Sequence, residues 1–223
     1  DRKFLVDNRV AAVADTVLIQ GSGVDLSLFE TTEEPKGEPV VILPSRLIWE
    51  KGIQEFVDAA AALRRDGVSA RFALIGNTHA SNPRAVPEET LRKWEADGIV
   101  EWWGRREDMP VVMAESHIVC QPSKYGEGVP KVLLEAAAAG RPVVATDTPG
   151  CREVIDDGAE GLLVPAADSA ALATALRRLI ENPSERRVLG MAARNRAETD
   201  FGVASVVAAT LEVYNSLKIT GPR

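Results

Sequence analysis

Short apolar runs alternate with longer helical patterns along most of the chain. The runs have the length of strands and stop at polar residues, Gly or Pro, as strands in a buried sheet do. The stretches between them repeat apolar residues every three or four positions, which is typical of helices. We predict strands at residues 16–19, 39–43, 71–75, 99–103, 118–121, 143–145 and 162–164, and helices at 51–65, 88–96, 109–115 and 130–139.

Strands that are continuous apolar runs, separated by helices, indicate a parallel sheet that is covered on both faces. The fold class predicted is therefore α/β, a doubly wound and Rossmann-like parallel sheet. From residue 167 onward the pattern is only helical, which predicts C-terminal helices at 169–181, 184–198 and 203–218. The last of these carries apolar positions available for packing, among them Val207, Leu211 and Tyr214.

Composition narrows the classes of partner and cofactor. The chain has 223 residues, is 45% hydrophobic and carries a net charge of -7, so it can bury a large core and shows no overall basic footprint for nucleic acid. Cys120 and Cys151 lack C-x-x-C spacing and only two histidines are present, so we expect no metal site. An apolar run of about 18 residues and a signal peptide are both missing, which favours a cytoplasmic protein.

The loops that follow the strands are the candidate ligand-binding segments, because ligands of doubly wound sheets bind beyond the carboxyl ends of the strands. The first such loop is "PSRLIWEKG", with Arg46 and Lys51 next to the start of a helix. Two cations beside a helix N-terminus make a candidate diphosphate site. The alternative is that both are solvated surface charges.

A second stretch, "PSKYGEGVPKVLLEAAAAG", places Glu127 in a Gly- and Pro-marked turn and Glu135 inside an apolar helix. An ionised group in such a helix is costly unless it has a partner, and that partner can be a ligand. Gly128 allows a ligand to approach the open backbone N–H groups at the start of the helix. A nucleotide diphosphate sugar suits this layout, with its charged middle at the helix start and hydroxyl groups at each carboxylate. The alternative makes Glu127 a solvated turn residue and Glu135 the buried partner of a protein cation.

A third loop, "WWGRRED", offers a candidate contact for a nucleobase through Trp103, Gly104 and Arg105. A guanidinium group can stack on a base. Arginines between a strand and a helix are also often exposed to solvent without binding a ligand, and this is the alternative to a base contact.

Taken together and in order, "PSRLIWEKG", "PSKYGEGVPKVLLEAAAAGRPVVATDTPGCREVI" and "DGAEGLLVP" resemble the C-terminal, donor-binding domain of family 4 retaining glycosyltransferases of the GT-B fold. Among these, the chain is most similar to enzymes of bacterial polysaccharide and lipid-linked oligosaccharide assembly. The resemblance implies metal-independent hexosyl transfer from a nucleotide diphosphate sugar, a UDP-sugar at the family level. It assigns the pyrophosphate to Arg46 and Lys51, the donor sugar to the catalytic Glu127 with Gly128, Val129 and Pro130, and the ribose to Glu135.

The resemblance also predicts a domain organisation. Residues 1–30 are expected to be the tail of a preceding N-terminal domain and the hinge "VLIQGSGVDLSLF", 31–200 the donor domain, and 201–223 a helix that crosses back. The preceding domain would bind a glycan or lipid-linked acceptor, and the full-length enzyme would associate peripherally with the inner face of the membrane. The isolated chain is then expected to bind a nucleotide diphosphate weakly, to transfer nothing, and either to self-associate or to displace its last helix.

Two other functions stay open at this point. A sugar-nucleotide epimerase of the GT-B fold would need catalytic carboxylates and histidines that the sequence does not identify. The isolated chain could also act as a non-catalytic nucleotide-binding module. Hydrolases are disfavoured because the chain has no G-x-S-x-G, no H-E-x-x-H and no Cys/His dyad.

Overall fold

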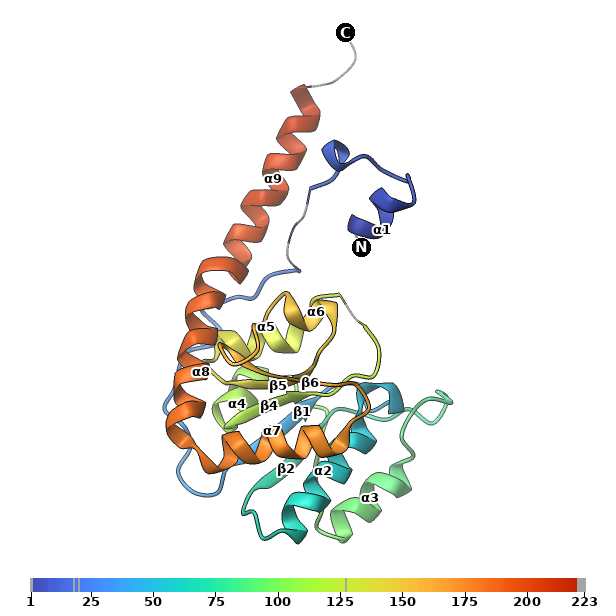
Figure 1. Cartoon of the computed structure of the whole chain (residues 1–223), viewed down its shortest axis with the longest axis vertical. Helices are drawn as coiled ribbons and strands as arrows, with labels where there is room; N and C mark the ends of the chain where they lie inside the picture. Colours follow the sequence, from blue (N-terminus) through green and yellow to red (C-terminus); the bar gives the residue numbers. More distant parts are fainter. Residues whose placement is uncertain (1, 18, 20, 127, 220–223) are drawn as a thin grey trace.

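The computed structural model describes residues 2–17, 19, 21–126 and 128–219. Its centre is a six-stranded parallel sheet with helices on both faces (Figure 1), which confirms the predicted fold class. The strands lie in the order β3-β2-β1-β4-β5-β6, and every neighbouring pair is parallel. Their bounds are β1 Val40–Pro44, β2 Arg71–Ile75, β3 Glu101–Gly104, β4 Ile118–Gln121, β5 Val143–Thr146 and β6 Gly161–Val164.

The sheet separates two apolar layers, and β1 shows why its sequence is apolar at every position. Val41 and Leu43 pack into the layer on one face, whereas Val40 and Ile42 pack into the layer on the other. Side chains of a strand alternate between faces, so a central strand that is covered on both sides needs a continuous apolar run.

Different helices cover the two faces of the sheet, apart from the C-terminal ones, which reach both layers. The first layer contains residues of α2 (Ile53–Arg65), α3 (Glu88–Ala96) and α7 (Ser169–Glu181). The second contains residues of α4 (Met109–Ala114), α5 (Lys131–Ala138) and α6 (Pro149–Arg152). The predicted helices are confirmed with small shifts at their ends; α2 begins at residue 53 because η2 (Trp49–Lys51) forms a 3₁₀ turn before it. The sequence did not indicate α6.

The C-terminal part continues through α8 (Pro183–Arg196), the π-helical turn η3 (Ala197–Phe201) and α9 (Val203–Ile219). Figure 1 shows α9 leaving the domain and extending well beyond it. None of the helices in the described part of the chain combines the length and apolar character that crossing a membrane requires.

The predicted strand at 16–19 is wrong. The described residues of this segment form no strand, and they follow a short 3₁₀ helix, η1 (Val13–Asp15), and the helix α1 (Arg2–Asp7). Val17 is largely exposed. Figure 1 shows this N-terminal segment away from the sheet, and a run of apolar residues becomes a strand only where another strand pairs with its backbone.

The N-terminal segment is joined to the start of α9 by two backbone hydrogen bonds. The amide of Val24 donates to the carbonyl of Phe201 at 2.8 Å, and the amide of Val203 donates back to the carbonyl of Val24 at 3.0 Å. The two ends of the chain therefore leave the domain side by side (Figure 1). The predicted domain boundaries at 30 and 200 stay predictions.

The polar stretch "TTEEPKGEP", at 31–39, is held firmly on the domain although its composition suggests a linker. The buried guanidinium of Arg186 forms a bidentate ion pair with Glu34 at 2.7 and 2.9 Å. The buried Arg141 donates to the hydroxyl of Thr32 at 2.7 Å and to its carbonyl at 3.1 Å. Two buried arginines thus fix the entry of the chain into β1.

Candidate functional site

A cavity of about 340 Å³ lies beyond the carboxyl ends of β1, β2 and β3. This is the edge at which doubly wound folds bind their ligands. Its wall combines cations, other polar groups and one buried carboxylate. The polar side chains that line it include Arg46, Asn77, His79, Arg105, Arg106 and Glu135.

Arg46 and Lys51 both follow β1, but the structure places them differently. Arg46 is exposed and lines the cavity. Lys51 ends the 3₁₀ turn, is buried, and holds its Nζ atom 5.8 Å from the ring centroid of Tyr125. One cation is therefore presented at the surface of the site, and the other lies under the loop that follows β4.

The loop after β4 is fastened to the start of α2. The amide of Lys124 donates to the carbonyl of Glu50 at 2.9 Å. Its Nζ atom lies 2.8 Å from Oε1 of Glu55, whose side chain is largely buried. The two loops in which the sequence predicts donor contacts are thus joined by backbone and charge.

Glu127, the predicted catalytic residue, lies outside the described residues. Of the residues that follow it, Gly128 is exposed, Val129 is half-buried, and Pro130 is buried at the N-cap of α5. No side-chain cap hydrogen bond is made at Pro130, because a proline side chain has no acceptor. The amide of Leu133 donates to the carbonyl of Pro130 at 3.0 Å, and no described residue accepts from the two N–H groups before it, those of Lys131 and Val132, which suits an anion.

Glu135 has a partner in the protein and also faces the cavity. Its Oε1 atom lies 3.3 Å from Nζ of Lys131, one helical turn earlier in α5. The Glu135 side chain is 11% exposed, whereas that of Lys131 is 72% exposed. Burial raises the pKa of Glu135 above its ordinary value, and the charge of Lys131 offsets part of that rise. The protein cation that the sequence left open is Lys131, and the carboxylate still lines the same cavity as Arg46.

The three residues predicted to contact the base do not line the same cavity. Arg105 lines the cavity and its guanidinium lies 3.0 Å from Glu107. Gly104 ends β3 with φ +66°. Trp103 instead lines a separate cavity of about 400 Å³ with Arg71, among others, and its indole N–H donates to Glu101 at 2.8 Å.

Two polar residues of the cavity were missed from the sequence. Asn77 and His79 belong to the loop "GNTHASNP", which follows β2 directly. Ligands of doubly wound sheets bind at the loops that follow the strands, and this loop follows β2, so the same rule predicts it as a candidate binding loop.

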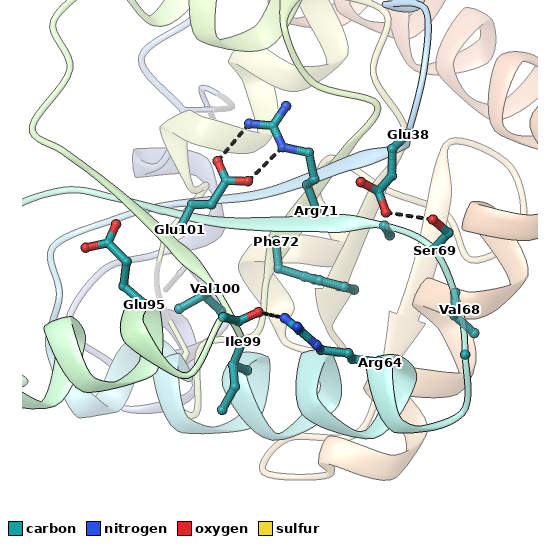
Figure 2. A pocket seen from close by; sticks show the side chains of 13 residues that line it. Glu38, Arg64, Val68, Ser69, Arg71, Phe72, Glu95, Ile99, Val100 and Glu101 are labelled. Carbon is teal, nitrogen blue, oxygen red and sulfur yellow. Dashed lines mark hydrogen bonds and ion pairs between the residues drawn. The ribbon is translucent and has the colours of Figure 1, made fainter.

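A larger cavity of about 580 Å³ opens at the opposite, amino-terminal edge of β2 and β3 (Figure 2). Figure 2 shows two polar pairs in its wall: Arg71 with Glu101 at 2.7 Å, and Ser69 with Glu38 at 2.7 Å. Polar groups that already bond each other offer little to a ligand, so the cavity at the carboxyl edge is the candidate site despite its smaller volume.

Within the described ranges, no group of three or more His, Cys, Asp or Glu side chains is arranged to hold a metal ion. Both cysteines, Cys120 and Cys151, are buried and form no disulfide with each other.

The architecture defines the class of protein: a six-stranded doubly wound domain that matches one half of a GT-B fold. Anabaena Alr3699/HepE in complex with UDP superposes with a TM-score of 0.84 at 24% identity, over 96% of this chain and 61% of that chain. Sucrose-phosphate synthase from Thermosynechococcus elongatus gives the same score and identity, over 99% of this chain and 57% of that chain.

Sequence comparison gives the family. Residues 38–182 match the family model described as "Glycosyl transferases group 1". The chain belongs to this family, as its motifs predicted, and it corresponds to the C-terminal domain.

Curated relatives include bacterial glycosyltransferases of lipid-linked and polysaccharide assembly. The N,N'-diacetylbacillosaminyl-diphospho-undecaprenol alpha-1,3-N-acetylgalactosaminyltransferase of Campylobacter jejuni is 32% identical over 161 residues, which are 72% of this chain and 40% of that protein. The phosphatidyl-myo-inositol mannosyltransferase of Mycobacterium leprae is 39% identical over 142 residues, 61% of this chain and 37% of that protein. The chain thus spans less than half the length of these relatives.

Proposed function

We propose that this chain is the donor-binding domain of a retaining glycosyltransferase that moves a hexose from a UDP-sugar to a glycan or lipid-linked acceptor. One observation carries the proposal: the buried carboxylate of Glu135 and the exposed guanidinium of Arg46 line one cavity at the carboxyl edge of the sheet. A carboxylate that accepts two ribose hydroxyls and a cation that meets a diphosphate are the two groups that a nucleotide diphosphate requires.

The other roles follow from position around that pair. Arg46 and Lys51, in the loop and the 3₁₀ turn that precede α2, neutralise the diphosphate together with the first two N–H groups of α5. The backbone of Gly128, Val129 and Pro130 lines the path to the sugar. The role of Glu127 as the residue that holds and orients the sugar rests on the motif alone. Arg105 is the candidate for the base, since Arg106, the other arginine of the loop motif that lines the cavity, already forms a bidentate pair with Asp108 at 2.7 and 2.6 Å.

The choice of UDP is supported by structural neighbours. Anabaena Alr3699/HepE has been solved with UDP, with UDP and glucose, and with UDP-glucose. The lipid-linked acceptor is supported by the names of the relatives from Campylobacter jejuni and Mycobacterium leprae. An enzyme that uses such an acceptor would work on the cytoplasmic side of a membrane, in peripheral contact with it.

The chemistry asked of this domain is mostly electrostatic. When the bond between the sugar and the diphosphate breaks, negative charge grows on the leaving diphosphate. Arg46, Lys51 and the helix start stabilise that charge more strongly in the transition state than in the bound donor. Glu135 fixes the ribose and so holds the reacting bond in place. The acceptor would be bound by a preceding domain, as the greater length of the relatives suggests. The isolated chain should therefore bind the donor and transfer nothing.

Calorimetric titration of the chain with UDP and with UDP-glucose tests the proposal. Glu135→Gln should weaken both ligands to a similar degree, by about 1 to 3 kcal/mol, because the ribose is common to both. Glu127→Gln should leave UDP binding nearly intact and lower the preference for a matching UDP-sugar. Glu89→Gln, an exposed carboxylate on α3, is the control and should change neither.

Equal losses for UDP and UDP-sugar in both variants would contradict the division of labour between Glu127 and Glu135. Failure of the unchanged chain to bind UDP or another nucleoside diphosphate would contradict the proposal as a whole. Product analysis with the full-length protein and a panel of nucleotide sugars then separates a transferase, which yields a glycosylated acceptor, from an epimerase, which yields a new sugar nucleotide.

A further inference from the structure

Lys131 occupies a position that a helix does not favour for a cation. It is the first residue of α5, whose first turn contains no acidic side chain. The N-terminus of a helix carries partial positive charge and prefers anions. Lys131 also precedes its partner Glu135 by four residues, and this order is the weaker one for an i,i+4 pair.

The pair that Lys131 forms is asymmetric in its exposure. Glu135 is buried at the wall of the cavity, whereas the Lys131 ammonium group lies 3.3 Å from it on a side chain that is mostly in solvent. A lysine side chain carries its charge at the end of a flexible four-carbon stem, so the charge can move several ångströms while the carboxylate stays in place. Lys131 is thus a mobile cation beside a fixed anion, at the helix start where the proposed diphosphate lies.

We propose that Lys131 is a third cation of the diphosphate site and changes partner when nucleotide binds. In the empty site it neutralises the buried charge of Glu135. When ribose hydroxyls donate to Glu135, the ammonium group turns to the diphosphate at the start of α5. This inference rests on the proposed function, because that function puts the ribose on Glu135 and the diphosphate at the helix start.

The exchange predicts opposite effects on ligands with and without phosphate. Removing the ammonium group takes a charge-assisted contact from a diphosphate. The same change frees Glu135 from a competitor, so a nucleoside that offers only its ribose hydroxyls loses nothing. A cation that merely keeps Glu135 in its ionised form predicts losses for both ligands. A surface ion pair without a role in binding predicts losses for neither.

The experiment compares uridine with UDP, at pH 8, for the unchanged chain and for Lys131→Met. UDP affinity should fall about tenfold, the loss expected for one charged hydrogen bond, and uridine affinity should stay equal or rise. NMR titration measures the weaker ligand and calorimetry the stronger. Lys131→Arg should retain most of the UDP affinity, since it restores a cation of similar reach.

The control is Lys93→Met. Lys93, on α3, forms an i,i+4 pair at 3.6 Å with Asp97, the C-cap of that helix, with the same order of charges and a similar exposure of the lysine, 69%. It should alter neither ligand. Equal losses of uridine and UDP in Lys131→Met, or no loss of UDP, would overturn the exchange while the proposed function stands if Glu135→Gln still weakens both ligands. A chain that binds neither UDP nor uridine would overturn the exchange and the proposed function together.

Discussion

The carbonyl oxygen of Pro122 lies where a side chain at position 52 would begin, because a Cβ atom placed on Gly52 would stand 2.0 Å from it. Gly52 also has φ +76°, in the left-handed region that disfavours residues with a Cβ. This contact seats the loop after β4 on the turn that starts α2. The two proposed donor loops can lie together only because residue 52 has no side chain.

Gly52→Ala should therefore damage both stability and binding. We expect a loss of about 2 to 3 kcal/mol in the free energy of unfolding, from backbone strain and from displacement of Pro122, and a loss of UDP affinity. Gly67→Ala is a matched control, because Gly67 has φ +79° but nothing within 4 Å of its added Cβ. It should lose only about 1 kcal/mol, the cost of the left-handed backbone, and keep its UDP affinity. Urea unfolding and calorimetry measure both, and similar results for the two variants would refute the role of the contact.

Nucleotide binding should rely on protein cations and not on a metal ion. UDP affinity is expected to persist in EDTA and to fall as salt rises, because screening weakens exposed charge pairs. Arg46→Ala should cost about 1.5 to 3 kcal/mol of UDP binding, as should Lys51→Met. Arg65→Ala, an exposed arginine at the far end of α2, should have no effect. Binding that disappears with EDTA, or that survives the changes at 46 and 51, would show that other groups hold the diphosphate.

Glu135 should stabilise the complex with ligand but lower the free energy of unfolding of the domain without ligand. Burial raises its pKa, so the folded chain binds this proton more tightly than the unfolded chain does. The sign follows: ionising Glu135, as pH rises above the unfolded value, makes the folded state less stable. Glu135→Gln should thus melt at the same temperature as the unchanged chain or higher at pH 7.5 without ligand. A marked fall in the melting temperature would identify the Lys131 pair as a structural contact.

Much of the fold could be read from the sequence because one physical rule covers most of it. Strands such as β1 are apolar throughout, since both faces are covered, and the helices between them show their own period. The segment 16–19 has the same apolar character and still forms no strand in its described residues. Its sequence carries no information about whether another strand lies next to it, so local pattern alone could not decide.

The site could be predicted in part for a related reason. Arg46 and Glu135 meet because the carboxyl ends of parallel strands share one edge of the sheet. Trp103 departs from the prediction because it lies inside β3, where its indole N–H donates to Glu101 at the start of the strand, whereas Arg105 lies beyond the strand end and lines the cavity. Side chains of a strand alternate between faces, and the sequence pattern did not show which partner this tryptophan would find.

His117 should make the stability of the domain depend on pH. Its Nδ1 atom accepts the amide of Val40 at 3.0 Å, and its Nε2–H group donates to the carbonyl of Pro35 at 3.0 Å. Burial lowers the pKa of His117, and the positive charge of Arg186 lowers it further. The unfolded chain then takes up a proton near pH 6.5 while the folded chain stays neutral, so stability is lost as pH falls below about 6.5.

Melting curves between about pH 7.5 and 5 test this dependence. His117→Gln should melt lower at all pH values, because it loses a buried contact at the start of β1, but with a shallower dependence on pH. His79→Gln should keep the slope of the unchanged chain, since His79 is exposed. Parallel curves for His117→Gln and the unchanged chain would contradict the role of this imidazole.

The apolar face of α9 should cause the chain to associate with itself. Residues spaced three or four apart along this 17-residue helix lie on one face, and each is 42% to 63% exposed. An exposed apolar stripe of that length tends to bind another apolar surface. Because α9 extends away from its own domain in Figure 1, a second copy of the chain can pack against the stripe. The stripe consists of Val203, Val207, Leu211, Tyr214 and Leu217.

A charge in the middle of this stripe should weaken association without unfolding the domain. Leu211→Glu is expected to sediment as a monomer at concentrations at which the unchanged chain forms dimers, with an unchanged melting temperature, because Leu211 is 52% exposed and contributes little to the core. Val188→Glu, on α8, is the control: Val188 is 65% exposed but lies outside the stripe, so it should not alter the sedimentation. Hydrogen exchange adds an independent measure, since amides of α9 should gain protection as the concentration of the unchanged chain rises and not in Leu211→Glu. A chain that stays monomeric at high concentration, with α9 already protected from exchange, would mean that the helix packs on its own domain and that the exposed stripe does not exist in solution.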